Sequence, residues 1–185
     1  MTVVTEGVMG DDTESILEEA EKALRAGKKI YDDDLNWRLH DLAEAGDEKA
    51  KTFFLKAIQT ASKGSWRLEA IRNVGFHYDL SSDLAAVEII RKALLADPWE
   101  MVRMAAASVL GIRSSWPDLA LYQALTADQD ESVRSAAFES LLRLSGMSYS
   151  ECRHIMAQVE AGTLPITPDS LGVLVGEKFS DLREC

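Results

Sequence analysis

Apolar side chains recur along most of this chain at steps of three and four residues, the spacing that places them on one face of an α-helix. In the segment 47–61 the apolar stripe consists of Ala50, Phe53, Phe54, Ala57, Ile58 and Ala61. No stretch alternates Val or Ile with polar residues between hairpin turns. The pattern therefore predicts an all-α protein.

Glycines and capping residues divide this helical pattern into segments. After a flexible start at 1–10, we expect an acidic cap helix over 11–27, then about four helical hairpins, and a final cap helix. The hairpins are predicted over 31–62, 65–96, 97–127 and 128–161, and the C-terminal cap over 167–183. We expect the whole chain, 1–185, to form one repeat domain, because each hairpin needs its neighbours to cover its apolar face.

The predicted helix starts have side chains that can accept free backbone amides. They are Asp11 with Glu14, Asp47, Ser81 or Ser82, Asp97 with Pro98 and Glu100, Asp128, Ser148 with Glu151, and Thr167 with Pro168.

One stretch of the chain is written twice, thirty-one residues apart. Residues 97–110 read DPWEMVRMAAASVL, and residues 128–141 read DQDESVRSAAFESL. Both copies have an Asp, then Val-Arg, a pair of alanines and a closing Leu. A fixed period of this size indicates a repeat architecture.

These two copies resemble HEAT repeats, in the small bacterial form found also in phycobilin-lyase-like proteins. The resemblance covers roughly residues 84–145, and Ile71-Arg72 extends the period back once more. It implies a right-handed α-α superhelix, a HEAT-like solenoid with capping helices at both ends. It says little about function, because function lies in sites grafted on such folds.

The repeated Asp and Arg have a structural explanation. Each Asp can accept amides at a helix start, and each Arg can bond the Asp of an adjacent unit. We therefore expect Asp97, Asp128, Arg103 and Arg134 to form a structural ladder. Function is expected where the copies differ, as at Trp99 against Asp130 and Met104 against Ser135.

The charge of the chain is strongly acidic, with a formal net charge of −11. Residues 11–48 hold thirteen acids and five bases, which is most of that excess. Such a surface repels phosphate backbones and attracts basic partners, although it also suits a solubilising end of a repeat stack.

The residues capable of catalysis do not form a recognisable constellation. Cys152 and His154 are two positions apart and diverge on a helix, and His77-Tyr78-Asp79 are consecutive and point in different directions. There is no nucleophile elbow, phosphate loop or dinucleotide fingerprint. We expect no enzyme activity, no cofactor and no metal site.

The candidate partner-binding residues are polar or aromatic positions expected at helix surfaces, helix starts and the acidic region. They are Glu88, Arg91, Lys92, Trp99, Trp116, Gln123, Asp32, Asp33 and Asp34.

The leading hypothesis is a non-enzymatic binding module for a basic protein, such as an immunity protein that neutralises a toxin nuclease. The resemblance implies an alternative, a lyase-like protein that acts on a tetrapyrrole or a phycobiliprotein. A third reading, nucleic-acid binding, is disfavoured by the acidity. The opening MTVVTEGVMG lacks a secretory pattern and no apolar run could span a membrane, so we expect a cytoplasmic protein.

Overall fold

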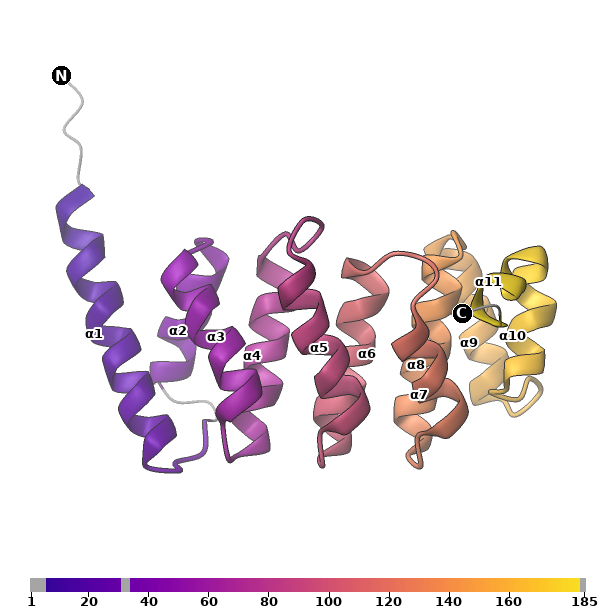
Figure 1. The fold of residues 1–185 in the computed structure, drawn as a ribbon, viewed down its shortest axis with the longest axis horizontal. Helices are drawn as coiled ribbons and strands as arrows, with labels where there is room; N and C mark the ends of the chain where they lie inside the picture. The colour runs from indigo at the N-terminus through magenta and orange to yellow at the C-terminus, as the bar shows by residue number, and fades with distance from the viewer. Residues whose placement is uncertain (1–5, 31–33, 184–185) are drawn as a thin grey trace, which may run out of the picture. The chain divides into compact units, whose positions relative to one another are not determined.

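The computed structural model describes residues 6–30 and 34–183, and the regular secondary structure of this part of the chain is entirely helical (Figure 1). The all-α prediction is therefore confirmed. The elements are α1 (Glu6–Arg25), α2 (Asp34–Glu44), α3 (Glu48–Thr60), α4 (Gly64–His77), α5 (Leu84–Ala96), α6 (Glu100–Arg113), α7 (Leu119–Ala127), α8 (Glu131–Leu144), α9 (Tyr149–Glu160), α10 (Pro168–Val175), a 3-10 turn (Gly176–Lys178) and α11 (Phe179–Arg183).

The helices form two compact units, Met1–Tyr78 with α1–α4 and Asp79–Cys185 with α5–α11. In the first unit α3 packs along α4, while α1 lies against α3 and α2 against α4. Its core is aliphatic and aromatic, because the helical spacing brings the apolar stripes of all four helices together. The largest contributors are Ile16, Leu39, Phe53, Phe54, Trp66 and Ile71.

The second unit repeats this two-layer arrangement. α5 pairs with α6 and α7 with α8, and the pairs stack so that α5 contacts α7 and α6 contacts α8. The small residues of the repeated stretch allow the close approach of α6 and α8. Gly111 lies against Ser140, whose hydroxyl donates a hydrogen bond of 2.9 Å to the Ala107 carbonyl.

This pairing differs in phase from the predicted hairpin 97–127. Short connections join α5 to α6 and α7 to α8, whereas a longer segment after Ser114 joins α6 to α7 and includes a cis Trp116–Pro117 peptide. The repeated Asp97 and Asp128 therefore lie inside a hairpin rather than at its start. The sequence period alone does not reveal which neighbouring helix each helix pairs with.

Three of the predicted helix starts are wrong in detail, and one of them is Asp128, because α8 is capped by Asp130. α5 is capped by Asp83 rather than Ser81 or Ser82, and α6 begins after Trp99 without a side-chain cap. Asp97 instead accepts the Trp99 amide at 2.9 Å, and Asp128 accepts the Asp130 amide in the same way. A carboxylate two residues before an amide forms a turn, which competes with the capping role.

Other start signals are confirmed. Asp47 caps α3, Ser148 and Glu151 form the expected capping box, and Thr167 caps α10 with Pro168 following it. The first helix begins at Glu6, five residues before the start expected at 11. The Asp11 signal lies inside this helix, since no Pro precedes it to end the helical run.

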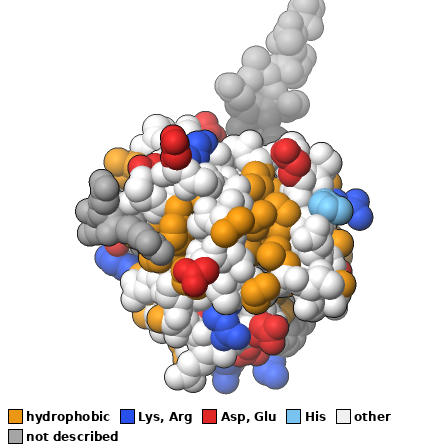
Figure 2. All heavy atoms as spheres, turned by 90° about the vertical axis from the view of Figure 1, so that its right-hand side faces the viewer, with side chains coloured by type: hydrophobic (Ala, Val, Ile, Leu, Met, Phe, Trp, Pro, Cys, Tyr) orange, Lys and Arg blue, Asp and Glu red, His pale blue; other side chains and the backbone are white. Residues whose placement is uncertain are grey.

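The C-terminal segment covers the last repeat. α10 packs on α8, and the following turn and α11 bury Phe179 and Leu182. Phe179 stacks edge-on against Tyr122 of α7, and the indole of Trp116 donates to Asp181 at 3.0 Å. The outer side of this cap stays apolar, since Val173 is 86% exposed and Figure 2 shows apolar side chains gathered at this end.

Candidate protein-binding surfaces

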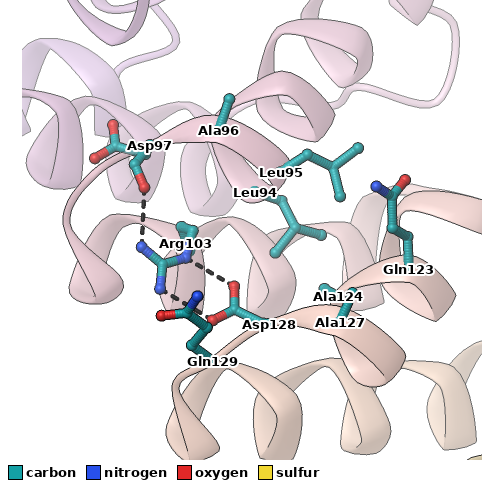
Figure 3. A pocket seen from close by; sticks show the side chains of 10 residues that line it. All are labelled: Leu94, Leu95, Ala96, Asp97, Arg103, Gln123, Ala124, Ala127, Asp128 and Gln129. Atoms are coloured by element: carbon teal, nitrogen blue, oxygen red, sulfur yellow. Dashed lines mark hydrogen bonds and ion pairs between the residues drawn. The ribbon is translucent and has the colours of Figure 1, made fainter.

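One groove of the second unit lies along α5 and α7 and is closed by the turns that follow them (Figure 3). It has a volume of about 310 Å³ and an apolar floor of Leu94 and Ala124. Leu95 and Gln123 form its open sides, and Leu95 is 42% exposed. The groove is therefore shallow, with its polar groups concentrated at one end.

That end is filled by the guanidinium of Arg103. Its Nε and Nη2 donate to the two carboxylate oxygens of Asp128 at 2.7 and 3.0 Å, and its Nη1 donates to the Asp97 carbonyl at 2.9 Å (Figure 3). The ion pair is nearly buried, with side-chain exposures of 16% and 9%. A forked pair of this kind is among the strongest side-chain interactions.

The pKa values of the pair follow from this geometry. Burial acts to raise the pKa of Asp128, but the bonds from Arg103 and the Asp130 amide outweigh it, so the pKa lies below its ordinary value. The hydrogen bond to Asp128 raises the pKa of Arg103. Both groups are held charged by a contact within the scaffold, so this end of the groove is structural.

Arg134 occupies the matching position in the next repeat without an equivalent carboxylate. It donates to the carbonyls of Asp128 and Gln129 at 2.9 and 3.0 Å. The position one period beyond Asp128 is Val159, so no Asp is available there. Of the rungs expected in this unit, the one from Arg103 to Asp128 is formed, whereas Arg134 has no Asp one period beyond Asp128.

A second buried ion pair in this unit was missed by sequence reasoning. Asp118 is fully buried, caps α7 through the amides of Ala120 and Leu121, and accepts two bonds from Arg91 at 3.1 and 2.9 Å. The signal for the cap is present, since an Asp directly precedes the apolar run of α7. The distance of twenty-seven residues to Arg91 carries no signal without the fold.

The structure distributes the proposed partner-binding residues between surface and scaffold. Glu88, Lys92 and Gln123 are exposed on α5 and α7, which lie in one layer. Arg91 and Trp116, in contrast, are held by Asp118 and Asp181.

Two further candidates belong to the turns and the N-terminal unit. Trp99 is half-buried before α6, and the exposed Asp34 pairs with Arg38 at 2.8 Å. Asp32 and Asp33 lie outside the described residues.

A second groove of the same unit runs along α6, α8 and α9. It has a volume of about 540 Å³, and its lining residues are Met104, Ser108, Glu131, Ser132, Ser135, Ala136, Glu139, Val159, Glu160 and Ile166. Met104 and Ser135, the position at which the two sequence copies differ, both contribute to it. Three of the lining side chains are glutamates and none is basic.

The histidines show no arrangement suited to catalysis or metal binding. His40 and His77 stack edge-on with centroids 4.7 Å apart, and His154 contacts Gln158 on the outside of α9 while Cys152 is buried. Among the described residues, no group of three or more His, Cys, Asp or Glu could hold a metal ion.

Comparison with known proteins agrees with this architecture. A family model described as HEAT repeats matches residues 52–142, the stretch from α3 to α8. Residues 52–142 belong to the HEAT-repeat family. No curated protein and no solved structure matched the chain.

HEAT repeats form helical modules that commonly mediate protein interactions, and such scaffolds are typically non-enzymatic. In the described part of the chain, no helix is long and apolar enough to cross a membrane. Two grooves and the layer of α5 and α7 are candidate partner surfaces of the second unit.

Proposed function

We propose that this HEAT-repeat chain is a non-enzymatic module that binds a basic protein partner. The acids outnumber the bases by 31 to 20. The carrying observation is that many of the bases are neutralised inside the chain. Arg38 bonds Glu19 and Asp34, and Lys56 bonds Glu21. In the second unit, three arginines bond carboxylates in the same way: Arg91 to Asp118, Arg103 to Asp128 and Arg143 to Glu139.

This internal pairing determines the field that a partner meets. The charges of a bonded carboxylate and guanidinium largely cancel, so the pair contributes little to the electrostatic potential at a distance. The unpaired acids contribute their full negative charge to that potential. The chain therefore attracts cationic surfaces and repels phosphate backbones. Long-range attraction of this kind raises association rates more than it raises affinity.

The specific form of the proposal is an inhibitor or immunity protein for a basic toxin such as a nuclease. An enzyme that binds nucleic acid needs a cationic active face, and an acidic scaffold of this size can cover it. Exposed Glu88 and Gln123, in the layer of α5 and α7, are part of the proposed contact surface. The proposed compartment is the cytoplasm.

The test is calorimetric titration of the purified chain with the protein encoded beside it and with a basic nuclease, at low and high salt. An acidic protein of similar size is the control. We expect binding to the basic proteins that weakens as salt rises, together with inhibition of the nuclease at equal stoichiometry. Equal binding to the acidic control, or affinity insensitive to salt, would contradict the proposal. A bilin and a DNA duplex in the same series test the two alternative functions.

A further inference from the structure

The groove along α6, α8 and α9 combines an apolar floor with an acidic rim. Met104, Ala136, Val159 and Ile166 supply the apolar lining, and the serines of α6 and α8 keep it open because their side chains are short. Ser108 turns its hydroxyl back onto the Met104 carbonyl at 3.1 Å, so it leaves no donor pointing into the groove. A partner backbone can approach this floor closely.

The rim carries the charge. Glu131 and Glu160 are exposed, and no ion pair or hydrogen bond holds either carboxylate among the described residues. Glu139 is bonded by Arg143, which is the one cation seen to contact a lining carboxylate and is not itself part of the lining. An occupant therefore meets two unpaired carboxylates together with the apolar lining residues, and positive charges on the occupant complement them.

The length of the groove suggests the form of the occupant. Glu131 and Glu139 are eight residues apart on α8, which is about 12 Å along a helix axis. A second helix laid alongside presents side chains at the same interval, so a cation and an apolar group can alternate along it in register. Helix-in-groove recognition uses this spacing of anchors.

We propose that this groove binds an amphipathic basic helix of a partner protein, with its apolar stripe on Met104 and Ile166 and its lysines or arginines at Glu131 and Glu160. This inference rests on the proposed function, because it assigns the site and form of a basic partner. It also explains the difference between the repeats. At matching positions Met104 supplies apolar contact, whereas Ser135 supplies clearance.

The probe is a fluorescent synthetic peptide of roughly 15 residues, built from Leu, Lys and Ala with leucines at helical spacing. Its anisotropy is measured against the full chain. The control peptide has the same sequence except for one central proline, which breaks the helix. We expect the helical peptide to bind at least several-fold more tightly than the broken one.

Two pairs of substitutions separate the groove from net charge. Glu131→Gln with Glu160→Gln removes the rim carboxylates, and we expect about tenfold weaker peptide binding. The matched control is Glu18→Gln with Glu177→Gln, which removes the same charge from exposed positions outside the groove and leaves affinity nearly unchanged. Ser135→Lys, which places a cation on the floor, is expected to abolish binding, with circular dichroism showing that the helices remain.

The outcomes distinguish the two proposals. Equal weakening by both glutamine pairs would overturn the groove and leave a general attraction to basic proteins. Equal binding of the proline-broken peptide would overturn the helical occupant. If neither peptide binds while a basic protein does, the groove is not the binding site and the proposed function stands. If no basic peptide or protein binds at low salt, both fail.

Discussion

The largest structural difference between the two sequence repeats, 97–110 and 128–141, concerns Arg103 and Arg134. Both donate a Nη1 hydrogen bond of 2.9 Å to the carbonyl six residues before them. Of the two, Arg103 also donates hydrogen bonds of 2.7 and 3.0 Å to the carboxylate of Asp128. Replacing each arginine by Met keeps the aliphatic part of the side chain and removes the guanidinium. Comparing the two variants therefore isolates the contribution of the Arg103–Asp128 ion pair to the free energy of unfolding.

The magnitude follows from burial. Removing one partner of a buried ion pair costs about 3–5 kcal/mol because the other charge is left uncompensated. Asp128 retains the amide of Asp130 as a donor and is 9% exposed, which places Arg103→Met near the lower end, at about 3 kcal/mol. Arg134→Met loses only bonds to carbonyls, at a cost of about 1 kcal/mol. We therefore expect a difference of about 2 kcal/mol between the variants.

The assay is urea unfolding of both variants, followed by helical circular dichroism and tryptophan fluorescence, with equal denaturant slopes as the check on comparability. Asp128→Asn is combined with each substitution in a double-mutant cycle. We expect a coupling energy above about 1.5 kcal/mol for Arg103 and a much smaller one for Arg134. Equal losses in the two single variants, or no coupling to Arg103, would refute the reasoning that the fork stabilises the stack.

Three further outcomes are expected. Gly111→Ala should lower the free energy of unfolding by about 1–3 kcal/mol, because a Cβ there would come within 2.9 Å of the Ser140 Cα. Adding Ser140→Ala to this variant should not restore the stability, measured by thermal unfolding, because that Cα remains. Arg91→Met should destabilise the chain by about 2 kcal/mol by leaving Asp118 buried without its cation, whereas Glu88→Gln, whose contact with Arg91 is 3.9 Å, should change the free energy of unfolding by less than about 0.5 kcal/mol. Burial and the nearby His40 lower the pKa of His77 and outweigh the opposing charge of Glu44, so the stability that the neutral imidazole provides is complete above about pH 6.5 and is lost as pH falls through the lowered pKa. Unfolding measured across that range should show the loss in the native chain and a smaller one in His77→Gln; identical profiles would contradict the assignment.

Several features of the candidate surfaces could be predicted from the sequence alone. The acidity, the repeat period and the contrast between Met104 and Ser135 are all properties of the sequence, and the two residues of that contrast line one groove. The acidic region before residue 48 was a weaker indication of a free acidic surface than its composition suggested, because several of its acids bond basic side chains within the first unit. Glu14, Glu19 and Glu21 bond Lys49, Arg38 and Lys56, contacts that span 19 to 35 residues.

The helical class, the approximate extent of most helices and the bond from Arg103 to the Asp of the next repeat were determined by the sequence. Periodicity and capping are local, so they are legible over a few turns. Tertiary structure decided which helix pairs with which, that Asp97 forms a turn rather than a cap, and that Arg134 bonds backbone carbonyls of Asp128 and Gln129. It also decided that Glu131, Glu139 and Glu160 share one groove. These features depend on contacts between side chains far apart in the chain, and local spacing carries no information about which distant side chains will meet.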